Sequence, residues 1–157
     1  MAVVLMLAAN DLKMIIRDRM LAFVFCMPFA LLIAGAWSIK KISGSFFDLS
    51  PYSALIISFA LIQIAVIFGF VYAFLMIDER DENILSALRV VSLSTDVFLT
   101  SRLLFASVFT FFYSVLSFFI LGPVEVPYPA IALISLTFAL LAPVLTLVIF
   151  TFSENKV

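Results

Sequence analysis

The sequence predicts an all-α, polytopic membrane protein whose single transmembrane domain occupies residues 1–157. Of the 157 residues, 66% are hydrophobic and only 12% are charged, and the mean hydropathy is +1.29. These values lie far outside the range of soluble globular domains, so the bilayer must solvate much of the surface. Four charge-free runs are each long enough to cross about 30 Å of hydrocarbon, which takes about 20 helical residues. Because these runs lack the alternation of barrel strands, they must pair their backbone amides as helices.

The chain begins with a segment, at about residues 3–17, that is apolar along one side of a helix. That side consists of Val3, Val4, Leu7, Leu12, Ile15 and Ile16. The pattern predicts a helix that lies in the membrane interface. The first span follows at about residues 20–39, and Pro28 is expected to kink it. We interpret it as a retained span and not as a cleaved signal peptide, because its apolar run continues to Ile39 without a charge.

The second, third and fourth spans are predicted at about residues 51–77, 100–122 and 129–152. Pro51 and Pro129 stand where two of them begin, and proline is tolerated in a first helical turn because its missing N–H would be unpaired there. Four spans and their connections account for the whole length, so no separate soluble domain is expected.

Basic residues near the span ends determine the predicted orientation. Seven of them lie on one side of the predicted membrane: Lys13, Arg17, Arg19, Arg80, Arg89, Arg102 and Lys156. Only Lys40 and Lys41 lie on the other side. Because basic residues favour the cytoplasmic side, we expect both termini and the loop between the second and third spans in the cytoplasm. The expected location is the inner or plasma membrane.

The loop between the second and third spans carries a pattern that a simple turn does not need. Apolar residues recur at helical spacing, at Ile84, Leu85, Leu88 and Val91. Acidic residues precede them and Arg89 lies near their end, which complements a helix dipole. The pattern predicts a cytoplasmic helix at about residues 79–91. Its apolar stripe must be buried against the membrane surface, the rest of the chain or a partner.

Most kinds of chemistry are disfavoured by what the sequence contains. It has no histidine and a single cysteine, Cys26, and no phosphate-binding glycine loop or nucleophile with a base is recognisable. No catalytic residue, cofactor or metal site is therefore predicted. A net charge of −1 gives no basic face for nucleic acid. The charge-free runs hold no carboxylate or lysine, which disfavours an ion-coupled carrier.

A few neutral polar residues remain inside the predicted spans. Those considered for a substrate path are Gln63, Tyr113 and Ser117. The alternative, which we favour for such residues and for Thr146, is hydrogen bonding between helices, worth about 0.6 kcal/mol on average. Gly69 is expected to permit close packing of two helices.

The loop also resembles a known family. Residues 78–94 read DERDENILSALRVVSLS and are followed by Ser101-Arg102-Leu103-Leu104. This is similar to type-2 ABC exporter permeases, which typically show a charged E-x-E-x-G-T-L-like run, a V-T-P-L-S-like run and a basic residue that opens the third span. The Asp11-Leu12-Lys13 and Arg17-Asp18 pairs, and the ending Glu154-Asn155-Lys156-Val157, resemble that family's N-terminal helix and its N-K-x-E-G segment.

The resemblance implies the membrane subunit of an ATP-driven export system that carries no ATPase of its own. A separate ABC ATPase subunit would dock on the loop helix. The implied docking residues are Asp78, Glu79, Arg80, Asp81, Glu82, Leu85 and Leu88. The subunit would act as a homodimer or heterodimer with another permease chain. Such permeases usually have six spans, so a chain with four is expected to be truncated, a fragment, or half of a split permease.

Two alternatives of other classes stay open at this point. A small four-span membrane protein could act by binding another membrane protein, as an immunity or assembly factor does. A uniporter or ion-coupled carrier is the second alternative, although the spans lack the ionisable groups it would need. The sequence does not identify a substrate, since apolar spans with neutral polar groups suit lipophilic drugs and lipids alike.

Overall fold

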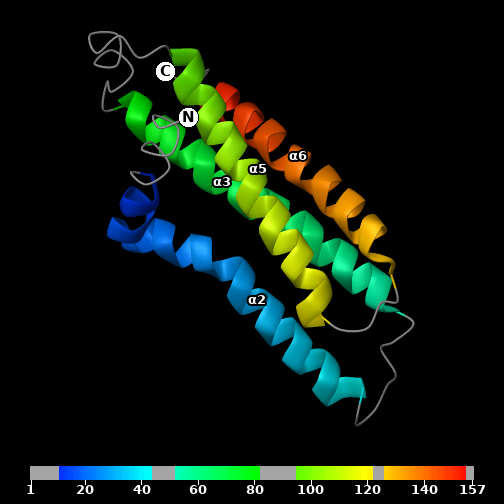
Figure 1. The fold of residues 1–157 in the computed structure, drawn as a ribbon. Helices are drawn as coiled ribbons and strands as arrows, with labels where there is room; N and C mark the ends of the chain where they lie inside the picture. The colour runs from blue at the N-terminus through cyan, green and yellow to red at the C-terminus, as the bar shows by residue number, and fades with distance from the viewer. Residues whose placement is uncertain (1–10, 44–51, 82–94, 122–125, 155–157) are drawn as a thin grey trace.

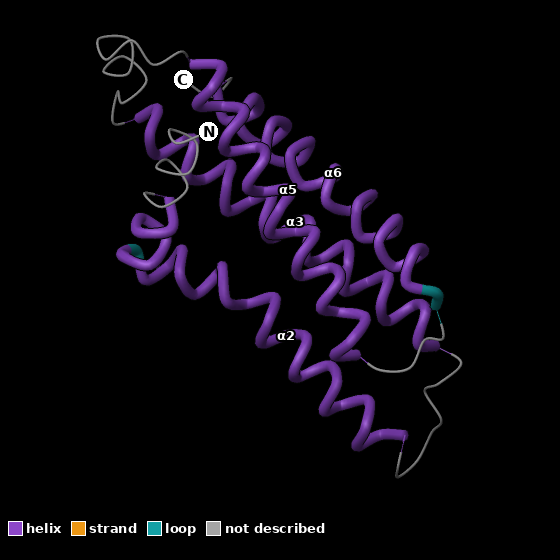
Figure 2. Tube along the Cα trace, viewed as in Figure 1, coloured by secondary structure: helices purple, strands orange, loops and turns teal. Residues whose placement is uncertain are grey.

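The described part of the chain is entirely α-helical apart from short connections. The computed structural model describes residues 11–43, 52–81, 95–121 and 126–154. Its long helices are α2 (Arg19–Ser43), α3 (Ser53–Asp81), α5 (Thr95–Leu121) and α6 (Tyr128–Glu154), and residues 11–17 form a further helical segment before α2 (Figures 1 and 2). The all-α prediction is confirmed. Residues 3–10 of the predicted interfacial helix and 82–91 of the predicted loop helix lie outside the described residues.

All four long helices contain a stretch that is long and apolar enough to cross a membrane. These stretches are Arg19–Lys41, Ser53–Asp81, Val97–Leu121 and Tyr128–Ser153. Each helix also exposes large apolar side chains, for example Phe23, Phe112 and Phe152. A water-soluble protein does not expose apolar surface on every helix, so these side chains face lipid. The prediction of a multi-pass membrane protein with four spans is thereby confirmed.

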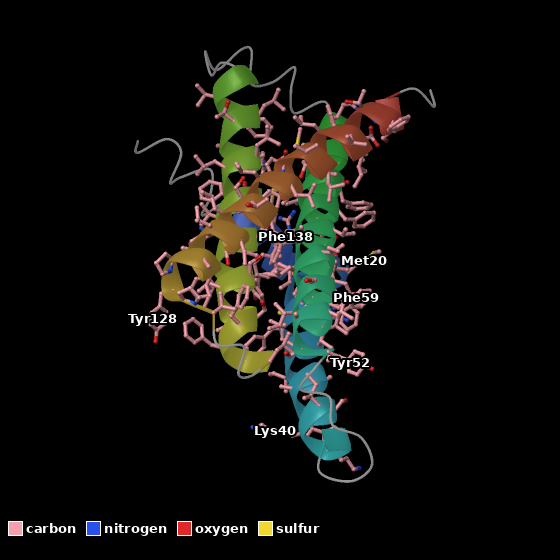
Figure 3. The ribbon with its side chains drawn as sticks, turned by 90° about the vertical axis from the view of Figure 1, so that its right-hand side faces the viewer. Met20, Lys40, Tyr52, Phe59, Tyr128 and Phe138 are labelled. Atoms are coloured by element: carbon pink, nitrogen blue, oxygen red, sulfur yellow. The ribbon has the colours of Figure 1, made fainter. Side chains whose placement is uncertain are left out.

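Helices α3, α5 and α6 form the compact part of the bundle, and α2 stands partly apart from them. Helix α6 packs against both α3 and α5 and crosses them obliquely (Figure 3). In the apolar stretch of α2 only 17% of the residues are buried, compared with 39% in α3. Figure 1 shows α2 on one side of the other three helices. The apolar stretch of α2 is therefore the least buried of the four.

Helices α3 and α6 touch at Gly69. A Cβ atom at this position would lie 2.9 Å from the Leu145 Cβ and 3.1 Å from the Ala142 carbonyl oxygen. The Thr146 hydroxyl bonds to the carbonyl oxygens of Gly69, at 3.1 Å, and of Ala142, at 3.0 Å. The predicted close-packing role of Gly69 and the interhelical hydrogen bond of Thr146 are both confirmed. Small residues allow such backbone approach between membrane helices.

Candidate functional site

A buried cluster of three charged side chains joins three separate parts of the chain. Arg102, in the second turn of α5, is 1% exposed, and Asp11 and Glu79 are also buried. One terminal nitrogen of the Arg102 guanidinium pairs with the Asp11 carboxylate, and the other donates to the Glu79 carboxylate near the end of α3. We call this group the ion cluster, and the end of the bundle that carries it the ion-cluster end.

The turn between residues 11–17 and α2 is stabilised by Asp18. Its carboxylate accepts hydrogen bonds from the backbone N–H of Met20, at 2.8 Å, and of Leu21, at 3.3 Å. An aspartate that binds these amides satisfies donors left unpaired at a helix start. Ile15 then packs in an apolar cluster with residues of all four long helices, including Leu21 and Tyr72. The cap and this packing hold the N-terminal segment against α3 and α5, where Asp11 reaches Arg102.

The ion cluster contains two acids and one base in a dry environment. Burial raises the pKa of the Asp11 carboxyl, and the Arg102 guanidinium beside it partly opposes that shift. The guanidinium carbon also lies 5.0 Å from the centre of the Phe98 ring, a distance that favours a cation–π contact. Removing one partner from a buried ion pair costs about 3–5 kcal/mol. Arg102 is therefore the residue on which the other two charges depend.

A groove lies between α2 and α3 at the opposite end, which we call the groove end. Its volume is about 290 Å³, and Gln63 is among its lining residues. The others are Pro28, Leu31, Leu32, Ala34, Gly35, Ser38, Ile56, Phe59, Ala60, Ile64, Ile67 and Leu121. A Cβ atom on Gly35 would lie 3.3 Å from a Leu121 methyl group, so α2 approaches the end of α5 closely there. The groove is apolar except for Gln63 and Ser38.

An aromatic cluster fills the space between α2, α3 and α5. The Phe25 ring lies 5.4 Å from Phe68 and 5.1 Å from Phe109, centre to centre and edge to face. Tyr113 lies 5.0 Å from Phe68. Such pairs are worth about 0.5–1.5 kcal/mol beyond the area that they bury. These rings connect α2 to the compact part of the bundle between the ion cluster and the groove.

A comparison of the chain with known proteins identifies its family. A family model matches residues 11–157, and its description is Fluoroquinolones export permease protein Rv2686c-like. The chain belongs to this Rv2686c-like permease family. The resemblance to ABC exporter permeases is thereby confirmed, and membrane transport by export is the activity of the class. Neither the curated proteins nor the solved structures gave a match.

The implied ATPase-docking residues of this Rv2686c-like permease differ in exposure. Asp78 and Asp81 are exposed at the end of α3. Arg80 is half-buried, with its Nε 3.4 Å from the Asp81 carboxylate and its guanidinium 5.5 Å from the Phe150 ring. Glu79 points into the bundle and pairs with Arg102. Glu82, Leu85 and Leu88 lie outside the described residues.

The three residues considered for the substrate path have different surroundings. Gln63 lines the groove, whereas Tyr113 belongs to the aromatic cluster. Ser117 is buried, and its hydroxyl donates to the Ser114 carbonyl oxygen of the same helix at 2.7 Å. Of the three, Gln63 is the residue that lines the groove of the Rv2686c-like permease.

The sequence does not predict the ion cluster. The sequence analysis assigns Glu79 to the implied docking residues, Arg102 to the basic residue that opens the third span, and Asp11 to a family-like segment. One signal was present, since an arginine close to the start of a span needs a partner before it can be buried among apolar residues. The identity of the partners required the fold. In the described ranges, no group of three or more cysteine and acidic side chains is placed to hold a metal ion.

Proposed function

We propose that this permease is the membrane subunit of an ATP-driven export system and takes its energy from a separate ABC ATPase subunit. The observation that carries the proposal is the family match over residues 11–157, which coincides with four helices capable of spanning a membrane. The loop between α3 and α5 is the proposed docking element. The end of α3, the start of α5 and the end of α6 lie at the ion-cluster end (Figure 1), which we place in the cytoplasm because basic residues concentrate there.

The ion cluster suits a subunit that receives a mechanical input at this loop. Glu79 lies just before the loop, Arg102 lies shortly after it, and both connect to Asp11 ahead of α2. These charges connect the end of α3 and the start of α5, which flank the loop, to the segment before α2. We propose that Asp78 and Asp81, with Arg80, Glu82, Leu85 and Leu88, face the ATPase. Glu79 would anchor the loop from inside the bundle.

Co-purification tests the docking proposal. The full chain is co-expressed with its candidate ATPase subunit and isolated in detergent, with Asp78→Lys and Asp81→Lys combined in one variant. We expect the ATPase to be lost from this variant, because two exposed carboxylates change sign. Lys40→Glu with Lys41→Glu is the matched control, a double charge reversal at the groove end. Equal recovery of the ATPase with both variants contradicts docking at the loop.

The family description names fluoroquinolones, and we propose aromatic amphiphiles of that kind as the exported substrates. Apolar spans with a few neutral polar groups suit such compounds. Cells that contain the permease and an active ATPase should accumulate less fluoroquinolone than cells without the permease. The difference should disappear when the ATPase cannot hydrolyse ATP. A difference that persists without hydrolysis and collapses with the ion gradient would indicate an ion-coupled carrier.

We further propose that two permease chains, identical or different, enclose the substrate path. Four helices are too few to surround a drug-sized molecule comfortably, and large apolar side chains such as Leu55 and Leu133 are exposed. Crosslinking in native membranes should give a species of twice the chain mass, or a defined heterodimer. A chain that stays monomeric in the active transport complex contradicts this part of the proposal.

A further inference from the structure

The groove between α2 and α3 opens sideways toward lipid. Two of its lining residues, Leu31 on α2 and Phe59 on α3, are exposed at 39% and 63%. Figure 3 shows Phe59 on the outer side of α3. Because both helices are membrane spans, a molecule would enter from the bilayer without passing through either end of the bundle. On the inner side, the groove is closed by Leu32, Ile64 and Leu121, which are buried.

Among the described residues, the side-chain amide of Gln63 lacks a hydrogen-bond partner in this apolar groove. Its side-chain amide lines the groove and makes no hydrogen bond with another residue that the structure describes. An amide without a partner in an apolar environment is costly, because neither lipid tails nor the surrounding side chains replace the lost water. The amide offers one acceptor and two donor positions. An acyl chain would fill the space but leave the amide unpaired.

We propose that this groove binds a flat, lipophilic aromatic compound that carries a hydrogen-bonding group such as a carbonyl, and that Gln63 is the residue that recognises this group. The volume of about 290 Å³ is at the lower end of the range of small-molecule sites, about 300–1,000 Å³. It admits one small ring system but not a helix, which packs about 8–10 Å from its neighbour's axis. Binding in the groove does not depend on the proposed function. Only the idea that the bound compound is the exported substrate rests on it.

A binding measurement on the full chain tests this proposal without an ATPase. The protein is placed in phosphatidylcholine nanodiscs, and the probe is prodan, a naphthalene that carries one ketone. Anthracene is the comparison probe, since it is flat and apolar but has no hydrogen-bonding group. Trp37 is the only tryptophan and precedes Ser38 of the groove lining. Saturable energy transfer from Trp37, corrected with empty nanodiscs, measures binding of either probe.

Two variants examine the two parts of the proposal. Gln63→Met keeps the length of the side chain but removes the amide, and should weaken prodan binding about threefold to tenfold while leaving anthracene binding unchanged. Ala60→Phe fills the groove and should weaken binding of both probes by about tenfold or more. The matched controls on exposed positions of α6 are Thr137→Val and Ala132→Phe, and neither should change binding.

The possible outcomes separate the site from the transport function. Unchanged binding in Ala60→Phe overturns the location of the site. Equal loss of both probes in Gln63→Met, or loss of neither, overturns recognition by the amide and leaves the groove as a place for lipid chains. Crosslinking of a second chain into the groove in place of prodan also overturns the proposal. If prodan binds as expected but no ATP-dependent export is found, the site stands and the proposed function fails.

Discussion

The two ends of the α2–α3 pair differ in whether their polar side chains have partners. At the ion-cluster end, Arg102 pairs with both Asp11 and Glu79, and all three side chains are buried. At the groove end, Gln63 lies next to open space and forms no hydrogen bond with another described residue. In a low-dielectric environment, a pair of opposite charges holds elements together, whereas a polar group without a partner is costly. Charged side chains thus tie the segment before α2 to α3 and α5 at one end, and a groove lies between α2 and α3 toward the other.

Packing follows the same division. The apolar cluster beneath the ion cluster draws on residues 11–17 and on every long helix. Toward the groove end, α2 contacts the other helices through Leu32, which shares an apolar cluster with Ile57 and Leu61 of α3, and through Gly35 against Leu121. Docking of an ATPase at the loop and binding of a compound in the groove, as proposed above, would use both properties. Substitutions at the two ends of the bundle test this division.

Replacing Arg102 with alanine should cause the greatest loss of stability, about 3–5 kcal/mol, because it leaves two buried carboxylates without their cation. The measurement is the free energy of unfolding of the purified chain in mixed micelles titrated with a denaturing detergent. Arg80→Ala is the control, since Arg80 pairs with the exposed Asp81 and such pairs contribute about 0–1 kcal/mol. Equal losses in the two variants would show that the ion cluster contributes no more than a surface pair.

Gly69→Ala should destabilise the chain by about 1–3 kcal/mol, because the new Cβ would lie 2.9 Å from the Leu145 Cβ and force α3 from α6. Gly35→Ala is the matched control at the groove end. Its Cβ would meet only a flexible Leu121 methyl group at 3.3 Å, so the loss should be much smaller. The same unfolding measurement applies. A Gly35→Ala loss as large as that of Gly69→Ala would contradict the looser packing of α2.

The sequence predicted the features that depend on local pattern and missed those that depend on tertiary contact. Long apolar runs identify spans because the bilayer demands them, and Gly69 and Thr146 were recognised because small and hydroxyl residues have few other uses in a span. Hydropathy assigns charged residues to loops, so it could not place Glu79 within α3 or pair it with Arg102. The sequence marks Gln63 as a polar residue inside a span. The groove around it depends on the course of α2, which no local pattern specifies.

Asp11→Asn should cost on the order of 1 kcal/mol, much less than Arg102→Ala, because the Arg102–Glu79 pair remains neutral overall. Burial raises the pKa of the Asp11 carboxyl, so the folded chain holds this proton more tightly than the unfolded chain does. The contribution of Asp11 to stability is then fully present below the unfolded pKa, about 3.9, and is lost as the pH rises through the folded pKa. The stability of the original chain relative to Asp11→Asn should therefore fall with rising pH in that window. A difference that rises with pH would mean that the charged form of Asp11 is the one stabilised.

Thr146→Val should have the smallest effect, about 0.6 kcal/mol, the average value of a hydrogen bond between membrane helices. The hydroxyl bonds to Gly69 on α3 and also to Ala142 on its own helix, so only the first bond links two helices. Thr137→Val is the control, because its hydroxyl donates only within α6, to the Leu133 carbonyl oxygen at 3.0 Å. The difference between the two variants in unfolding free energy isolates the interhelical bond. A difference of zero would mean that the contact at Gly69 depends on backbone approach alone, and that hydrogen bonding adds nothing to the compact half of the bundle.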